Sequence, residues 1–211
     1  MIDTRDALLC SQGYIIEQSV IPEKICTDAV LCLNKNPDEF YTWKDTESIR
    51  FRNWVQNFLT HTYPVFNGYG AELQVFNRYT GGVQWWHDDN SATYGYPVTG
   101  PRRIFVCCYL TDTRNGGGAL KIIPDSHLGG YKSMRTAMQK VYKNGIKIPQ
   151  THDYNGETRM QYPELFNNHP SEITLNVPAG SIIAVDERMI HRTEINTRPE
   201  RRTMVLWWLH L

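Results

Sequence analysis

The sequence predicts a mainly β fold with α-helical cover, arranged as an antiparallel sandwich. From about residue 73 onward, short runs rich in valine, isoleucine and aromatic residues are separated by turn sequences and mostly lack helices between them. Such a succession of short strands is typical of antiparallel sheets. Two helical patterns precede these runs, and a chain of 211 residues is long enough for one compact domain with a sizeable buried core.

The elements ahead of the sheet are a first strand and two helices. Residues 13–17 predict the strand, and Pro22 stands where the first residue of a helix is expected. The first helix should end at residues 34–37, and it places on one side the apolar residues Ile25, Cys26, Ala29, Cys32 and Leu33. The second helix is expected over about residues 46–60, with a stripe at spacings of three and four formed by Phe51, Trp54, Val55 and Phe58. We expect both helices to cover a sheet.

Six strands and one long insertion are expected after residue 73. The strands are residues 75–79, 104–110, 120–123, 173–177, 181–185 and 203–209. Between the third and the fourth, residues 131–143 look helical and belong to an insertion over about residues 129–170. The first part of this insertion is basic, through Lys132, Arg135, Lys140, Lys143 and Lys147. Two interpretations stay open, a lid that meets an anionic group of a substrate or a solvated helix face.

Charge and composition argue against several classes of protein. Lysine plus arginine and aspartate plus glutamate both number 22, so no global field would recruit nucleic acid or an anionic membrane. The N-terminus has no basic, apolar leader and no run of eighteen apolar residues occurs, so we expect a cytoplasmic protein. The five cysteines are odd in number and lie mainly in apolar contexts, which indicates buried thiols and not a disulfide framework or a zinc site. The oligomeric state is left open.

The most informative chemical pattern is the pair His87 and Asp89, because residues two apart on an extended strand point to the same side. The two side chains can then bind one metal ion from adjacent positions, while Asp88 points away. His191, which follows a buried-looking strand, is our candidate for a third ligand, and His127 is its rival. Two histidines and one carboxylate leave three positions of an octahedron open, which is the arrangement of non-haem Fe(II) oxygenases.

Three segments of the chain, taken in order, carry a family pattern. Residues 73–90 lead through a glycine turn into the His87 and Asp89 triplet, residues 102–127 end in Pro124-Asp125-Ser126-His127, and residues 177–208 contain His191. Together they resemble the Fe(II)/2-oxoglutarate-dependent oxygenases, especially prolyl hydroxylases and the phytanoyl-CoA hydroxylase family. The resemblance implies a double-stranded β-helix, or jelly roll. It also implies one oxygenase domain over residues 1–211, with helical cover at about 20–60, a β core at about 70–128 and 172–209, and the insertion at about 129–170.

The resemblance assigns roles at the metal by position. It makes His87, Asp89 and His191 the iron ligands and the catalytic centre. Tyr79 resembles the tyrosine whose hydroxyl reaches the cosubstrate 2-oxoglutarate near the iron. His127 resembles the histidine of a P-x-S-H turn, which is typically not an iron ligand.

The resemblance also assigns the residues that hold the far carboxylate of 2-oxoglutarate. Tyr109 is similar to the tyrosine that forms a hydrogen bond with it, and Arg201 to the arginine that forms a salt bridge with it. Thr203 would then lie on the same strand face as Arg201 and add a hydrogen bond. Arg202 is the competitor, one residue out of phase, and Thr203 favours the Arg201 register because Arg202 would share its face with Met204.

The implied activity is hydroxylation of a small-molecule or peptidyl substrate with Fe(II), 2-oxoglutarate and O2, giving succinate and CO2. Asp89 favours hydroxylation over halogenation, because halogenating relatives replace this carboxylate with a small residue. Two alternatives remain. A non-catalytic jelly-roll binding protein would usually lack a ligand or the arginine, and a cupin-like metalloenzyme that does not use 2-oxoglutarate would need more histidines near His87. The identity of the substrate does not follow from these residues.

Overall fold

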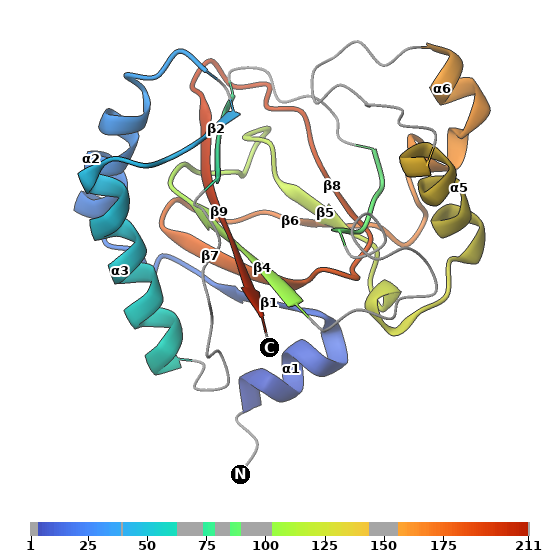
Figure 1. The fold of residues 1–211 in the computed structure, drawn as a ribbon, viewed down its shortest axis with the longest axis horizontal. Coiled ribbons are helices and arrows are strands. Elements are labelled where there is room, and N and C mark those ends of the chain that lie inside the picture. Colours follow the sequence, from blue (N-terminus) through green and yellow to red (C-terminus); the bar gives the residue numbers. More distant parts are fainter. Residues whose placement is uncertain are drawn as a thin grey trace.

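Two antiparallel sheets form the centre of the computed structural model, which describes residues 4–38, 40–62, 74–78, 85–89, 103–143 and 156–210 (Figure 1). Within these residues, the larger sheet has the order β1 (Tyr14–Glu17), β7 (Ser181–Asp186), β4 (Arg103–Tyr109), β9 (Arg202–His210), β3 (Gln74–Arg78) and β2 (Phe40–Thr42). The smaller sheet has the order β6 (Ile173–Leu175), β5 (Leu120–Ile122) and β8 (His191–Thr193). Neighbouring strands in both sheets are antiparallel, which confirms the mainly β class with helical cover.

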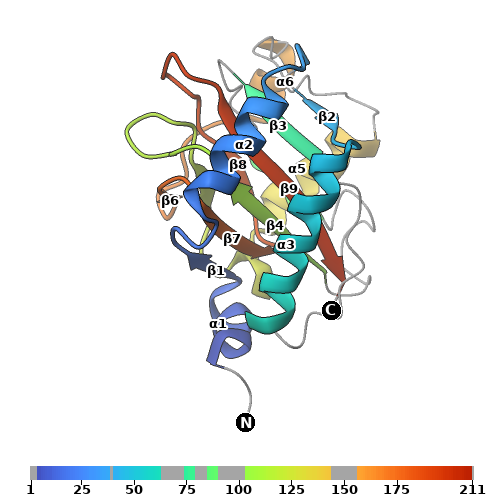
Figure 2. The same cartoon turned by 90° about the vertical axis from the view of Figure 1, so that its left-hand side faces the viewer.

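Helices α2 (Glu23–Leu33) and α3 (Thr46–Thr62) cover the outer face of the larger sheet, as Figure 2 shows. Their apolar sides bury Leu33, Phe51 and Val55 against the sheet residues Val106 and Ile182. Both helices were expected at nearly these bounds. Helix α1 (Thr4–Gln12) was not expected, because nine residues give too short a periodic pattern to be recognised.

The inner face of the larger sheet packs on the smaller sheet. Successive residues of β4 alternate, so that Phe105, Cys107 and Tyr109 point inward while the residues between them face α2 and α3. The inward side chains meet Leu120 and Ile122 of β5 and exclude water from the space between the sheets. Any chemistry on the inner face therefore takes place in largely apolar surroundings.

Helix α5 (Lys132–Lys143) lies beside the smaller sheet, next to α6 (Gly156–Gln161) and the short 3₁₀ helices η1 (Ser126–Leu128) and η2 (Pro163–Leu165) (Figure 1). It buries Met134 and Met138 against Trp86 and Ile190. The helix expected over residues 131–143 is thus confirmed. Arg135, however, is 1% exposed and does not belong to a solvated basic face.

The short strands β2 and β8 and helix α6 were not expected either, because segments of three to six residues carry too little periodic pattern to be recognised. No helix in the described part of the chain is long and apolar enough to cross a bilayer.

Candidate metal centre

His87, Asp89 and His191 come together on the inner side of the smaller sheet. His87 forms an isolated antiparallel bridge with His191, so that it continues this sheet beyond β8. The carboxylate of Asp89 lies 3.9 Å from Nε2 of His87 and 3.6 Å from Nε2 of His191. One ligand atom from each of the three residues falls within 4.8 Å of the others. The three side chains are therefore close enough to bind a single ion.

The two imidazole rings are held so that the same nitrogen of each faces the ion site. Nδ1 of His87 is 2.8 Å from the carbonyl oxygen of Trp85, and Nδ1 of His191 is 2.9 Å from that of Met189. A carbonyl oxygen can only accept, so each Nδ1 carries a proton and donates it. The lone pair of each neutral ring then lies on Nε2, which faces Asp89. Such backbone support is the usual way in which a metal-binding histidine is oriented.

Burial favours neutral side chains at this centre. It lowers the pKa of His87 and, together with the charge of His87, lowers that of His191 well below its ordinary range. Burial, followed by the nearby carboxylates of Asp88 and Glu187, raises the pKa of Asp89 to about 8. A divalent cation would reverse this balance, because it stabilises the ionised carboxylate and takes the free lone pairs of both rings. The donor set thus fits a metal ion of the iron type.

Asp88 points away from the ligands, as expected, but it is not at the surface. Its carboxylate is fully buried and forms an ion pair with the guanidinium of Arg135 on α5. The second terminal nitrogen of Arg135 donates to the carbonyl oxygens of Ser126, at 2.6 Å, and Arg188, at 3.0 Å. The residue between the two ligands His87 and Asp89 is therefore anchored to a helix of the insertion.

His127 does not join the metal ligands among the residues that the structure describes. Its Nε2 lies 3.1 Å from the carbonyl oxygen of Cys10, and its ring packs on Gly13. Gly13 has a φ of +78°, and a Cβ there would lie 2.5 Å from the ring, so the chain needs glycine at this turn. His127 thus fixes the N-terminal helix to the P-x-S-H turn.

The register of β9 differs from the expected one. Met204, directly opposite Tyr109 of β4, belongs to the inner core, whereas Val205 belongs to the outer one. By alternation, Arg202 points inward with Met204 and Tyr109, while Thr203 points toward α2 and α3. Arg202 is 2% exposed, and its charge lowers the pKa of Tyr109 against the larger upward effect of burial. The prediction that Arg202 faces outward is wrong.

Arg201 and Thr203 lie on the other side of the sheet from the metal centre. The guanidinium of Arg201 donates to the carbonyl oxygen of Asn36, at 3.1 Å, in the segment that follows α2. The backbone of Thr203 accepts from Leu110 and donates to the hydroxyl of Thr111. Neither residue is brought to the ligands. Tyr79, expected to lie near the metal, falls outside the described residues.

Arg202 and Tyr109 form a buried polar pair whose hydrogen-bonding capacity is only partly used. One terminal nitrogen of Arg202 donates to the carbonyl oxygen of Gly118, at 3.0 Å. Within the described chain, Nε of Arg202 has no hydrogen-bond partner, and the hydroxyl of Tyr109 meets only the weakly accepting thiol of Cys107. Buried groups of this kind are normally satisfied, so their presence indicates a missing acceptor. A carboxylate fits, because it accepts from a guanidinium and a hydroxyl together.

Comparisons with known proteins identify the family. No curated protein sequence matches the chain. The chain is similar in structure to HygX from Streptomyces hygroscopicus with iron bound, at 14% identity and a TM-score of 0.67, over 100% of this chain and 87% of that one. It resembles HygX with nickel and 2-oxoglutarate bound to the same extent, with 14% identity, a TM-score of 0.66 and the same coverage of 100% and 87%.

A third solved structure is the epimerase SnoN in complex with Fe3+, alpha ketoglutarate and nogalamycin RO, with 14% identity, a TM-score of 0.63 and coverage of 97% of this chain and 81% of that chain. At such low identity, these likenesses show a shared fold. The family evidence is stronger, because residues 23–204, most of the chain, match the family described as Phytanoyl-CoA dioxygenase (PhyH). The chain belongs to the phytanoyl-CoA dioxygenase family.

Proposed function

We propose that this protein hydroxylates an organic substrate with Fe(II), 2-oxoglutarate and O2. As a member of its family, it is a 2-oxoglutarate-dependent oxygenase-type enzyme. The finer proposal is that residues 1–211 form one jelly-roll domain with the reaction between its two sheets. The observation that carries the proposal is the cluster of His87, Asp89 and His191 beside a buried arginine and tyrosine.

The iron would be held by Nε2 of His87, Nε2 of His191 and the carboxylate of Asp89. The proton positions deduced for the two rings support this assignment, because both free lone pairs face Asp89. Phe105 lies against His191, with the ring centroids 4.7 Å apart, and gives the site an apolar wall. The structures of HygX with iron bound and of SnoN with Fe3+ show that proteins of similar fold bind iron.

The carboxylate of 2-oxoglutarate far from the iron would lie between Arg202 and Tyr109. Both groups are buried, both offer a donor that no oxygen atom of the described chain accepts, and both stand on the inner face with the ligands. Burial raises the pKa of Tyr109, so that its hydroxyl keeps the proton that it would donate. HygX with nickel and 2-oxoglutarate bound, and SnoN with alpha ketoglutarate, show that the fold accommodates this cosubstrate.

The iron, when bound with its cosubstrate, supplies the oxidising chemistry that amino-acid side chains lack. The residues of the chain orient the groups: the backbone carbonyls fix both imidazoles, Asp89 supplies the anionic ligand, and Arg202 sets the direction of the cosubstrate. The apolar inner core lines the side of the reacting centre between the sheets and limits the access of water from there. In the overall reaction, a C–H bond, 2-oxoglutarate and O2 give a C–OH group, succinate and CO2. One oxygen atom of O2 enters the alcohol and the other enters succinate.

We propose a small molecule or a peptide as the substrate. Hydroxylation is favoured by the intact carboxylate of Asp89, although an epimerase such as SnoN is built on a similar fold. Epimerisation would leave no new oxygen in the product. Mass spectrometry of a reaction under ¹⁸O2 therefore separates the two, because only the hydroxylated product carries the label.

The cofactor proposal is tested without knowledge of the substrate. Anaerobic addition of Fe(II) and then 2-oxoglutarate should produce the weak visible charge-transfer band of the chelate, and admission of ¹⁸O2 should give slow formation of labelled succinate. Fe(II) binding without the band would favour a cupin-like metalloenzyme that does not use 2-oxoglutarate. Absence of metal binding would favour a non-catalytic binding protein.

A further inference from the structure

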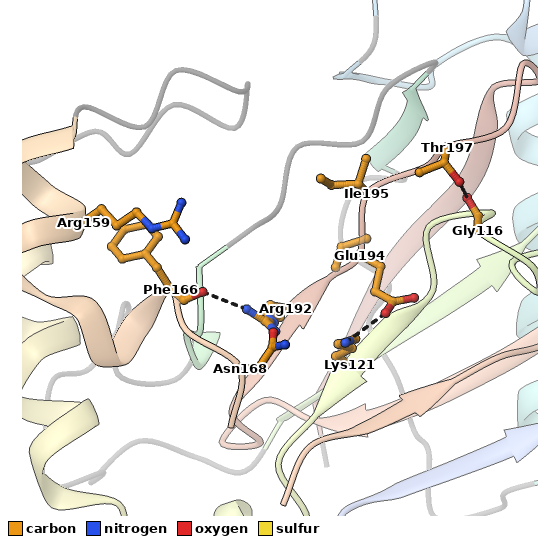
Figure 3. Close-up of a pocket in the computed structure, with 10 residues that line it drawn as sticks. Gly116, Lys121, Arg159, Phe166, Asn168, Arg192, Glu194, Ile195 and Thr197 are labelled. Atoms are coloured by element: carbon orange, nitrogen blue, oxygen red, sulfur yellow. Dashed lines mark hydrogen bonds and ion pairs between the residues drawn. The ribbon is translucent and has the colours of Figure 1, made fainter. Parts of the chain in front are cut away.

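A cavity of about 590 Å³ lies away from the metal centre, between α6, the residues after η2 and the segment that follows β8 (Figure 3). This volume is within the range of small-molecule sites. Its apolar lining consists of Phe166, beside Arg159, and the 41%-exposed Ile195 across the space (Figure 3). The polar part of its lining is formed by Lys121, Arg159, Asn168, Arg192, Thr193, Glu194 and Thr197.

The cavity is on the opposite face of the smaller sheet from the metal ligands. Lys121 of β5 and Arg192 of β8 stand opposite each other in the sheet, as do Ile122 and His191 one residue away. Because strand residues alternate, the first pair faces the cavity while Ile122 and His191 face the inner core. The sheet itself therefore separates the cavity from the site that would hold iron.

The floor of the cavity is electrically balanced. Glu172 binds Lys121 at 2.6 Å and Arg192 at 3.0 Å, and Glu194 binds Lys121 at 2.9 Å. Arg192 is further fixed by the side-chain oxygen of Asn168, at 2.6 Å, and its guanidinium lies over the ring of the buried Trp86. Two cations and two carboxylates thus compensate each other in a fixed arrangement. These groups shape the floor and leave little net charge there.

Arg159 is the cation that this network does not neutralise. It stands on α6 at the wall across from Glu194, and Figure 3 shows its guanidinium directed toward the space between them. It forms no ion pair or hydrogen bond within the described residues. Among the described residues of the lining and the floor, Arg159 therefore leaves an excess of one positive charge. The planar guanidinium favours a carboxylate or a phosphate, and the side chains of Phe166 and Ile195 favour a hydrocarbon or aromatic body.

We propose that this cavity is a binding site for a small organic oxyanion, a carboxylate or a phosphate ester with an apolar body. The anionic group would lie on Arg159, and the body would lie against Phe166 and Ile195. The site is distinct from the metal ligands and from the Arg202 and Tyr109 pair, so it does not depend on the proposed oxygenase reaction.

The test uses three aromatic probes of similar size and the full chain without added 2-oxoglutarate, so that no other carboxylate competes for the cavity. Benzoate and phenyl phosphate should bind, and the neutral benzamide should not. Titrations followed by protein NMR should shift the amide signals of Thr193, Glu194 and Ile195. Comparison of benzoate with phenyl phosphate shows which oxyanion is preferred.

Three variants make the test specific. Arg159→Gln should weaken binding about tenfold or more, since a charge-assisted hydrogen bond is lost. Glu194→Gln should strengthen it about twofold or more, because a repelling carboxylate is removed. Arg50→Gln, the same change on the distant helix α3, should leave binding unaltered. The proposal is overturned if no probe binds, if benzamide binds as well as benzoate, or if Arg159→Gln binds like the unmodified chain. Binding of 2-oxoglutarate is measured separately, so its failure would count only against the proposed function.

Discussion

The buried ion pair of Asp88 and Arg135 offers the sharpest test of how the metal-binding segment is held. Arg135→Met removes the guanidinium but keeps an unbranched, apolar side chain of similar reach. It leaves a fully buried carboxylate without its counter-charge and frees the carbonyl oxygens of Ser126 and Arg188. Breaking a buried pair by removing one partner typically costs about 3–5 kcal/mol.

That cost can be converted into a melting temperature. A domain of 211 residues has an unfolding entropy of about 0.44 kcal/mol per kelvin, from about 2.1 cal/mol/K per residue. Arg135→Met should therefore lower the Tm by roughly 7–11 °C in scanning calorimetry. The exposed Arg50, paired with Glu47 on α3, gives the matched control, and Arg50→Met should change the Tm little.

A second variant distinguishes the charge from the packing. The double variant Asp88→Asn with Arg135→Met removes both charges, so it should regain more than half of the lost stability. A fall in Tm of under about 2 °C for Arg135→Met would refute the reasoning that a buried carboxylate is costly without its counter-charge. A double variant no more stable than Arg135→Met alone would refute it too.

Three other outcomes are expected. His191→Ala should abolish stoichiometric Fe(II) binding measured by metal analysis, whereas His127→Ala should retain it; full iron content in the first variant would move the third ligand elsewhere. Arg202→Leu should raise the Kd for 2-oxoglutarate by tens of fold or more, since the loss of one partner of a buried charged pair costs about 2–5 kcal/mol. Arg201→Leu should change this Kd little. The opposite ranking would contradict the observed register of β9. Glu172→Gln should lower the Tm at pH 7, and its difference from the unmodified chain should shrink as the pH falls below 4.5, the ordinary pKa of glutamate. The hydrogen bond from Lys121 and the charge of Arg192 outweigh burial and lower the pKa of Glu172. The ionised carboxylate therefore stabilises the fold above the unfolded-state pKa, and this stabilisation is lost as the carboxyl is protonated. A constant difference in Tm down to pH 3 would show that the charge of Glu172 is not involved.

The sequence predicted the metal centre better than the carboxylate site. The spacing of His87 and Asp89 needs only strand geometry, and the structure brings both beside His191. The register of β9 was missed because a shift of one residue exchanges the two faces of a strand, and the adjacent arginines Arg201 and Arg202 left both phases chemically plausible. Met204 carried the useful signal, since an apolar side chain opposite Tyr109 belongs to the core.

Features formed by distant residues were beyond the reach of local patterns. Arg135 belongs to a stretch rich in lysine and arginine, and only its position on the buried side of α5 distinguishes it from its exposed neighbours. Its partner Asp88 lies 47 residues earlier, and no periodicity relates the two. The cavity lined by Arg159 likewise depends on how α6 and the segment after β8 are placed in space.

The bridge between His87 and His191 has a consequence for the order of events in folding. The two residues exchange backbone hydrogen bonds of 3.1 Å and 2.8 Å, although more than a hundred residues separate them in the chain. Closing so long a loop is entropically costly until the intervening strands have paired. We therefore expect these two ligands to meet only late in folding, so that metal affinity during refolding appears with the native state and not with early collapse.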